Sequence, residues 1–335
     1  MATRYWVGGT GNWDGSDTSH WSATSGGSGG ASAPGYTDDV VFDGNSGGGT
    51  VTRSGGATTK SLTTTGFSGT IQSDALYVNG SVIIGSGTTI TTQIGINGTG
   101  NLSGTFNTTL TIGSSAVVTL TGNLVCSGTF IVANTSTFNA GSYNVSAQSF
   151  AGYDTCTVNM GSGTWTLSGT GSWPWAWYGG TLNKQTASMV FSGDGSRTMR
   201  GGGKAYPSLT VQGSTAGQAF NIEGNNTFDA LNSSIAVAHS IRFFPGSSQT
   251  IKAMSNVASA GNLQTLTISS GVTPATLTYS GSDRIGLDYL SISYITATPA
   301  NSFYAGTHST NGGNNSGWLF TDPPPRSGLF FGATF

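Results

Sequence analysis

Charged residues are scarce in this chain of 335 residues. Only 7% of the residues are Asp, Glu, Lys or Arg, and Glu223 is the one glutamate. The 11 basic and 13 acidic residues give a formal net charge of −2. They form no basic patch in the sequence, so we expect no nucleic-acid ligand.

Long apolar runs are also missing. No run approaches the roughly 20 residues that a membrane-spanning helix needs, so we expect no membrane insertion. The opening segment, Met1–Val7, has no charged stretch followed by an apolar core. We therefore expect synthesis in a cytoplasm without a cleaved signal peptide.

Cysteine is almost absent. Cys126 and Cys156 are the only two, which excludes a framework of several disulfides. We expect both to be buried free thiols.

Apolar residues at helical spacing are rare as well. Instead, short apolar runs such as Leu76–Ile84, Val117–Leu120 and Gly128–Val132 recur between Gly, Ser, Thr and Asn, and there are 54 glycines. Strands of this length with such dense turns predict an all-β fold. The hydrophobic share is 36%, below the usual value of about 45–50%. Such a thin core favours a solenoid, in which each coil buries only a narrow stripe.

The chain divides into four parts by composition. Residues 1–50 hold three tryptophans, Trp6, Trp13 and Trp21, and we expect an aromatic-rich cap over the first coil of the solenoid. Residues 51–205 carry the clearest strand repeats, although their uneven spacing fixes no period. Residues 206–320 are either a second β unit or a continuation of the solenoid.

Residues 321–335 begin with a proline-rich stretch that cannot join a sheet. We expect an extended arm of polyproline type with an aromatic tip. The tip residues Leu329, Phe330, Phe331 and Phe335 would be a liability in water. We expect them to dock on the body of the chain or on a neighbouring subunit, as an assembly contact.

A pair of carboxylates would be the signature of a glycan-cleaving enzyme. Glycoside hydrolysis uses two of them, about 5–9.5 Å apart, and stacked coils could bring them together from distant positions. The candidates are Asp154, Asp194, Glu223 and Asp229. With a single glutamate in the chain, we expect no catalytic site.

Neither a metal nor a cofactor is indicated. His20, His239 and His308 lie far apart, with no metal spacing and no Ser/His/Asp signature. Asp38, Asp39 and Asp43 lack the regular spacing of a calcium loop, so we expect them to stabilise turns or the cap.

The densest aromatic cluster is Trp173, Trp175, Trp177 and Tyr178, around one proline. Three roles remain open for it. The rings could pack in the core at a bend, anchor a protein interface, or stack on the faces of sugars.

Several segments together resemble known proteins. Tyr5–Trp13 and Thr37–Asp43 resemble the start of many phage and bacterial β-helix surface proteins, and Phe220–Phe228, Leu287–Ile292 and Tyr304–Phe320 fit the same group. The ending, Ser327–Phe335, resembles one found on virion proteins of tailed phages. This resemblance implies a right-handed parallel β-helix and a place on a virion. It supplies no catalytic residues.

From these observations we expect a structural protein of a phage virion, assembled as a homotrimer with other virion proteins. The first hypothesis is a tail or baseplate fibre or spike that recognises a glycan or protein of the host surface. The alternatives are a capsid decoration or head fibre, and a tailspike that depolymerises glycans.

Overall fold

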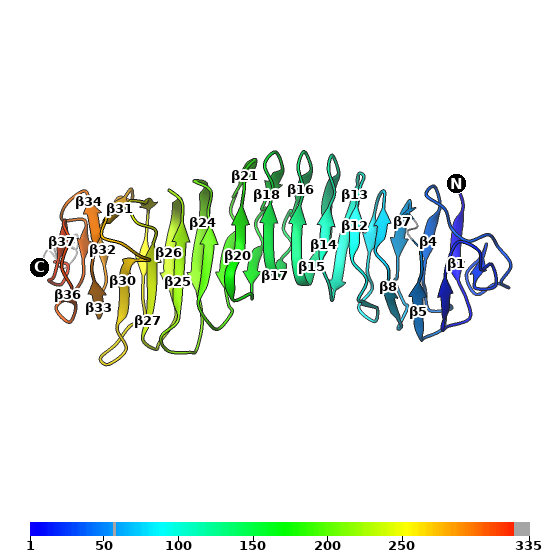
Figure 1. Ribbon diagram of the computed structural model, residues 1–335, viewed down its shortest axis with the longest axis horizontal. Coiled ribbons are helices and arrows are strands. Elements are labelled where there is room, and N and C mark those ends of the chain that lie inside the picture. Colours follow the sequence, from blue (N-terminus) through cyan, green and yellow to red (C-terminus); the bar gives the residue numbers. More distant parts are fainter. Residues whose placement is uncertain (56–57, 325–335) are drawn as a thin grey trace, which may run out of the picture.

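A computed structural model describes residues 1–55 and 58–324 of the chain. The described residues form an all-β solenoid of about 13 turns, with the N-terminus at one end of a rod and the C-terminal coils at the other (Figure 1). At about 4.8 Å per coil, the stack is about 60 Å long. No helix occurs in this part of the chain, and hence none that could cross a bilayer. The all-β solenoid prediction is confirmed, while the hand of the coil stays a prediction.

Most strands belong to one sheet that winds along the rod. Its strands up to residue 152 are β1 (Thr3–Trp6), β3 (Trp21–Ser22), β4 (Asp39–Val41), β6 (Thr58–Thr59), β7 (Ser61–Thr63), β9 (Leu76–Val78), β10 (Val82–Ile83), β12 (Ile94–Ile96), β13 (Gly100–Phe106), β14 (Leu110–Ile112), β15 (Val117–Val132), β16 (Thr137–Asn139) and β17 (Val145–Gly152).

The sheet continues with β18 (Thr157–Asn159), β19 (Thr164–Leu167), β20 (Gly171–Trp177), β21 (Thr181–Asn183), β22 (Ser188–Phe191), β23 (Arg197–Arg200), β24 (Ala205–Val211), β25 (Ala219–Glu223), β26 (Thr227–Ser233), β27 (His239–Phe243), β28 (Ser248–Ile251), β29 (Met254–Ser255), β30 (Gln264–Ile268), β31 (Ala275–Tyr279), β33 (Leu290–Ile292), β34 (Ile295–Thr298) and β36 (Thr310–Asn311).

Two smaller sheets complete the coils at the ends of the rod. Near the N-terminus the strands are β2 (Gly11–Trp13), β5 (Thr50–Arg53), β8 (Thr70–Ser73) and β11 (Thr89–Ile90). Near the C-terminus they are β32 (Ile285–Gly286), β35 (Phe303–Tyr304) and β37 (Trp318–Leu319).

Each strand alternates between the core and the surface. In β18, Val158 is fully buried while Thr157 and Asn159 on either side of it are partly exposed. A two-residue period places alternate side chains on opposite faces of a sheet. Each coil therefore buries its Val, Ile, Leu or Phe and presents Thr, Ser and Asn outward.

The length of a coil is not constant, which explains why the sequence fixes no period. Val82 pairs in parallel with Leu102 in the next coil, and Trp165 pairs in the same way with Met189. The second pair is separated by a longer stretch of chain than the first. In this coil the extra residues lie between Leu167 and Trp175, because Ala147 pairs with Leu167 whereas Phe150 pairs with Trp175.

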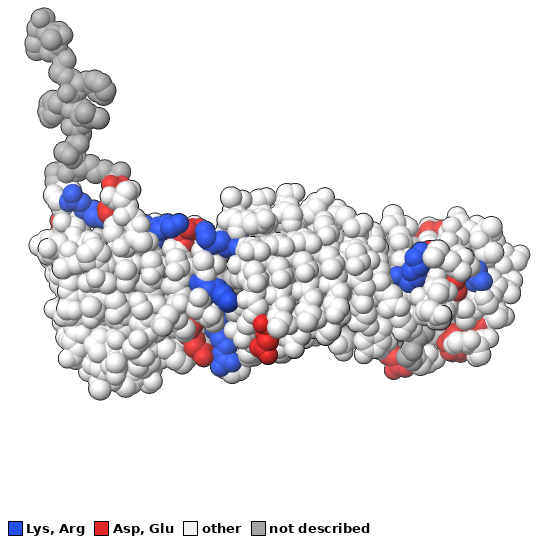
Figure 2. Space-filling model, turned by 90° about the horizontal axis from the view of Figure 1, so that it is seen from above, with Lys and Arg blue, Asp and Glu red and all other residues white. Residues whose placement is uncertain are grey.

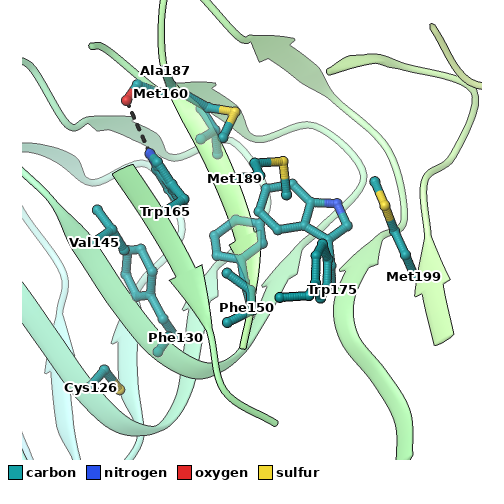
Figure 3. Close-up of a cluster of buried hydrophobic side chains, with 14 of the residues drawn as sticks. Cys126, Phe130, Val145, Phe150, Met160, Trp165, Trp175, Ala187, Met189 and Met199 are labelled. Atoms are coloured by element: carbon teal, nitrogen blue, oxygen red, sulfur yellow. Dashed lines mark hydrogen bonds between the residues drawn. The ribbon is translucent and has the colours of Figure 1, made fainter. Parts of the chain in front are cut away.

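Aromatic and aliphatic side chains fill the middle of the rod. The rings of Phe150 and Trp175, from neighbouring coils, stack with centroids 4.5 Å apart. Trp165 lies beside them and donates a hydrogen bond from Nε1 to the Met160 carbonyl oxygen at 3.0 Å (Figure 3). Cys126 and Cys156 are buried free thiols, as predicted.

The N-terminal end is closed by a strand of opposite direction. β1 pairs in parallel with β4 but antiparallel with β3, where Trp6 faces Trp21. Trp6, Trp13 and Trp21 are all buried, and the centroids of all three rings lie within 6.1 Å of the Phe42 ring centroid. The three tryptophans expected in a cap therefore lie in the core of the first coils.

The solenoid continues across the boundary expected between residues 205 and 206. β24 spans this position and pairs with β22 before it and with β26 after it. Residues 231–239 are the end of β26, a short connection and the first residue of β27.

The C-terminal arm is described only to residue 324. Its first part stays against the rod, since the Asp322 carboxylate accepts a hydrogen bond from the Thr307 amide at 3.3 Å. Leu329, Phe330, Phe331 and Phe335 lie outside the described residues, so their expected docking stays a prediction.

Candidate functional site

The structure divides the Trp173–Tyr178 cluster into two halves. Trp175 and Trp177 are at most 1% exposed, whereas Trp173 is 38% and Tyr178 is 40% exposed. Trp175 donates from Nε1 to the Tyr206 hydroxyl at 3.1 Å inside the core. An interface or glycan-binding role for Trp175 and Trp177 is therefore wrong, because their rings are inside the coil, and the core alternative holds for these two.

A bulge in β20 brings Trp173 to the surface. Gly171 pairs with Arg197 and Trp175 pairs with Met199, so four steps along β20 match two steps along β23. Trp173 lies within this bulge with φ of 59°, which is unusual for a bulky residue. Conformations of this kind cost about 1–2 kcal/mol. The bulge directs the ring outward instead of into the core.

The exposed rings form a small surface with two residues from neighbouring coils. Tyr153 stacks on Tyr178, with ring centroids 5.1 Å apart. The Arg200 guanidinium carbon lies 4.2 Å from the Trp173 ring centroid and 5.3 Å from that of Tyr178. We call Tyr153, Trp173, Tyr178 and Arg200 the platform.

The ring faces of the platform are largely occupied by one another. Tyr153 comes from the coil before Tyr178, and Arg200 comes from the coil after it. Tyr178 thus has a neighbour in the coil on each side, and one face of Trp173 lies against Arg200. Tyr, Trp and Arg are the residue types that most often carry the binding energy of protein interfaces. Of the two surface roles left open by the sequence, the geometry favours a protein interface.

Three of the four candidate catalytic carboxylates are engaged by other side chains. Glu223 accepts a hydrogen bond from Arg200 Nε at 3.2 Å. Asp229 binds Lys184 and also Lys252, the latter at 2.8 Å. Asp194 accepts hydrogen bonds from Ser214, and Asp154 is exposed on the surface.

The pKa values that shift among these groups move downward. Burial raises the pKa of Asp229, but the hydrogen bonds and charges of Lys184 and Lys252 outweigh it and lower that pKa. Hydrogen bonds from the Ser214 backbone and side chain lower the pKa of Asp194. A general acid needs a raised pKa, so the lowered pKa values of Asp194 and Asp229 do not fit that role. Their hydrogen bonds and ion pairs instead join neighbouring coils.

The three histidines lie in three separate places. His20 contacts Asp17 at 2.9 Å near the N-terminus, and His308 contacts Asp288 at 2.7 Å near the C-terminus. His239 is buried, with Nε2 2.8 Å from the Ser233 hydroxyl and Nδ1 2.8 Å from a backbone carbonyl. Burial lowers the pKa of His239. Both ring nitrogens of His239 thus have partners other than a carboxylate, so this Ser–His pair lacks the third member of a triad.

The N-terminal aspartates hold turns and neighbouring coils. Asp38 accepts from the amides of Ala2 and Gly35. Asp39 pairs with Lys60 at 3.0 Å, and Asp43 accepts from the Asn45 amide at 2.9 Å. Within residues 1–55 and 58–324, no group of three or more His, Cys, Asp or Glu is placed to hold a metal ion.

Sequence reasoning missed Tyr153 and Arg200. Each is separated from Tyr178 by roughly the length of one coil, Tyr153 before it and Arg200 after it. Knowing the coil length would have placed them beside it, but the variable corners concealed that length.

Comparison of the chain with known protein families, with curated proteins and with solved structures found no match.

Proposed function

We propose that this chain is a structural protein of a phage virion, a rigid rod that takes part in contact with the host surface. The resemblance of its opening and closing segments to phage β-helix proteins supports the virion location. The fold supports the mechanical role, since a stack of about 13 coils presents a long surface held by backbone ladders.

The platform carries the proposal, as a place where the rod meets another protein. Tyr, Trp and Arg are the residue types that dominate binding energy in protein interfaces. Here Trp173, Tyr178 and Arg200 come from neighbouring coils and contact one another, so they are ordered before any partner arrives. A preordered surface loses less side-chain entropy on binding.

Repetition of the rod in a symmetric assembly would give it affinity for a cell surface. Several weak contacts to glycans or proteins add up when they are linked. A homotrimer is the form that we propose, in the tail or baseplate, with other virion proteins at its ends.

Labelling of intact particles tests this proposal. An antibody against the purified chain, followed by electron microscopy, should mark the tail or baseplate, and purified chain should compete with particles for adsorption to host cells. Labelling over the whole head, with hundreds of copies per particle, would instead identify a capsid decoration. Release of reducing sugar from host polysaccharide would identify a depolymerase. Absence of the chain from particles would contradict the proposal.

A further inference from the structure

A cleft opens in the side of the rod towards its C-terminal end. It is lined by residues 252–254 of one coil and residues 279–286 of the next. Its volume of about 640 Å³ lies within the range of about 300–1,000 Å³ that is typical of small-molecule sites. A smaller hollow of about 300 Å³ adjoins it, since residues 282–284 line both.

The cleft exists because the strand ladder changes here. Ile251 pairs with Tyr279 in the next coil, so the two coils are in register up to this point. Two residues, Lys252 and Ala253, then connect β28 to β29, whereas five residues, 280–284, connect β31 to β32. Within the described residues β29 pairs with β26 and β32 pairs with β35, so no ladder closes the space between β29 and β32.

The surface of the cleft is polar. Two of its apolar lining residues, Met254 and Ile285, are at most 7% exposed. Tyr279, Ser280 and Ser282 bring hydroxyl groups, which both donate and accept hydrogen bonds. Such a lining suits a ligand that carries several hydroxyl groups of its own.

The loop of residues 280–284 packs closely on both coils. A Cβ atom on Gly281 would lie 2.5 Å from the Tyr279 hydroxyl and 2.6 Å from the Lys252 carbonyl oxygen. The Tyr279 ring in turn meets the Phe303 ring edge to face, with centroids 6.1 Å apart. This wall is therefore ordered before a ligand arrives, which lowers the entropic cost of binding.

The side chains at the cleft carry a net positive charge. Lys252 is exposed, and its Nζ lies 2.8 Å from the Asp229 carboxylate, which also binds Lys184. One carboxylate cannot neutralise two ammonium groups. On the loop, the charges of Asp283 and Arg284 cancel formally, so the three cations and two carboxylates leave a charge of +1.

Arg284 is suited to holding an anion. Its guanidinium carbon lies 5.6 Å from the Tyr304 ring centroid. A guanidinium that contacts a ring through its face can still form two parallel hydrogen bonds from its edge to a carboxylate or phosphate. Lys252 adds a second, point-like charge in the same cleft.

These cations are a local feature of the rod. Residues 75–153 contain no Asp, Glu, Lys, Arg or His, and Figure 2 shows this uncharged stretch between two groups of charged residues. A net charge of +1 fits a ligand with one acidic group, whereas a nucleic acid requires contacts to many phosphates.

We propose that the cleft binds an acidic saccharide, whose carboxylate or phosphate is held by Arg284 and Lys252 and whose hydroxyl groups meet those of Tyr279 and the loop. The inference rests on the proposed function in one respect only, since the host surface would be the source of such saccharides. The binding itself is a property of the chain and is measured without particles.

Isothermal titration calorimetry with the purified full chain tests the inference. The probes are trimers of galacturonic acid, of glycerol phosphate and of galactose, which carry carboxylates, phosphates and no charge, respectively. An acidic probe should bind at least about tenfold more tightly than the neutral one, and added salt should weaken its binding. The tighter of the two acidic probes identifies the acidic group.

Arg284→Gln should weaken binding of that probe about tenfold or more, because it removes a bidentate charged contact. Lys252→Gln should weaken it as well. Lys60→Gln is the matched control, since Lys60 also pairs with an aspartate of an earlier coil, Asp39 at 3.0 Å, but lies near the N-terminus. It should bind as the wild type does, and circular dichroism should confirm that all three variants fold.

Failure of both acidic probes to bind at millimolar concentration would overturn the inference, as would equal binding of the neutral probe. So would unchanged binding by Arg284→Gln and Lys252→Gln, or an equal loss in Lys60→Gln, because the attraction would then come from elsewhere on the rod. Particle labelling tests the proposed function separately. A chain that binds the acidic probe but is absent from particles would support the cleft and contradict the virion location, and labelled tails without probe binding would do the reverse.

Discussion

Asn159 donates a hydrogen bond from Nδ2 to Oδ1 of Asn139, one coil earlier, at 2.7 Å. Asn183 donates in the same way to Asn159, also at 2.7 Å, so the three amides form a ladder parallel to the rod axis. Each amide in the middle of such a ladder both donates and accepts. The ladder therefore joins coils through side chains in addition to the backbone.

Replacement of Asn159 by Ala should remove both hydrogen bonds. The free energy of unfolding should fall by about 1 kcal/mol. This is the low end of the range for two hydrogen bonds, because water partly hydrates the site. Urea denaturation measures it. Thr166→Ala, an outward position on a different face, is the control, and an equal loss there would show that the ladder adds nothing specific.

Trp173 and Trp175 should respond in opposite ways to substitution. Trp173→Asn should change the free energy of unfolding little, because Asn tolerates the positive φ and the lost contact with Arg200 is worth only about 0.5–1 kcal/mol. Trp175→Ala should cost about 3–5 kcal/mol, since it leaves a cavity in the core. Thermal unfolding of both variants tests this, and similar losses would contradict the division of the cluster.

Acid should loosen the loop that precedes Trp21. The Asp17 carboxylate accepts hydrogen bonds from the Ser19 hydroxyl and amide and contacts His20, and these bonds lower the pKa of Asp17 to about 2. A lowered pKa means that the contribution of Asp17 to stability is present above the ordinary value of 3.8 and is lost as the pH falls towards 2.

The amide proton of Ser19 reports on this titration by NMR. Its chemical shift should move between about pH 4 and about pH 2, and the movement should vanish in Asp17→Asn. A midpoint near 3.8 would show that the carboxylate is not held by its neighbours.

The two thiols should be unreactive in the folded chain. Burial raises the pKa of Cys126, and it raises the pKa of Cys156 to about 11. A thiol reagent at about pH 8 should therefore label neither until denaturant is added. The Cys156 thiol ionises near pH 9 in the unfolded chain but only near 11 in the folded chain. Its ionisation should therefore lower the free energy of unfolding as the pH rises from 9 to 11. Rapid labelling of the native protein would contradict the buried positions.

The sequence predicted the kind of fold but not its register. The alternation around Thr157–Asn159 and Thr164–Leu167 is visible in the sequence and matches β18 and β19. A two-residue period identifies a strand, but it does not say which strand lies next to it. That pairing depends on the corners and on bulges within strands, which change the number of residues from coil to coil.

The candidate site shows the same limit. Trp173 and Trp175 are two positions apart in the sequence, and simple alternation would place both on the same face. The bulge and the positive φ at Trp173 separate them instead. Arg200 joins Trp173 only after the coil length is known, so the composition indicated an aromatic site without its partners.

The most direct test of this account is an electron cryo-microscopy reconstruction of the particles in which we propose that the chain lies. It should resolve rods of about 60 Å in which successive β layers lie about 4.8 Å apart. Density for the chain without stacked β layers at this spacing would contradict it.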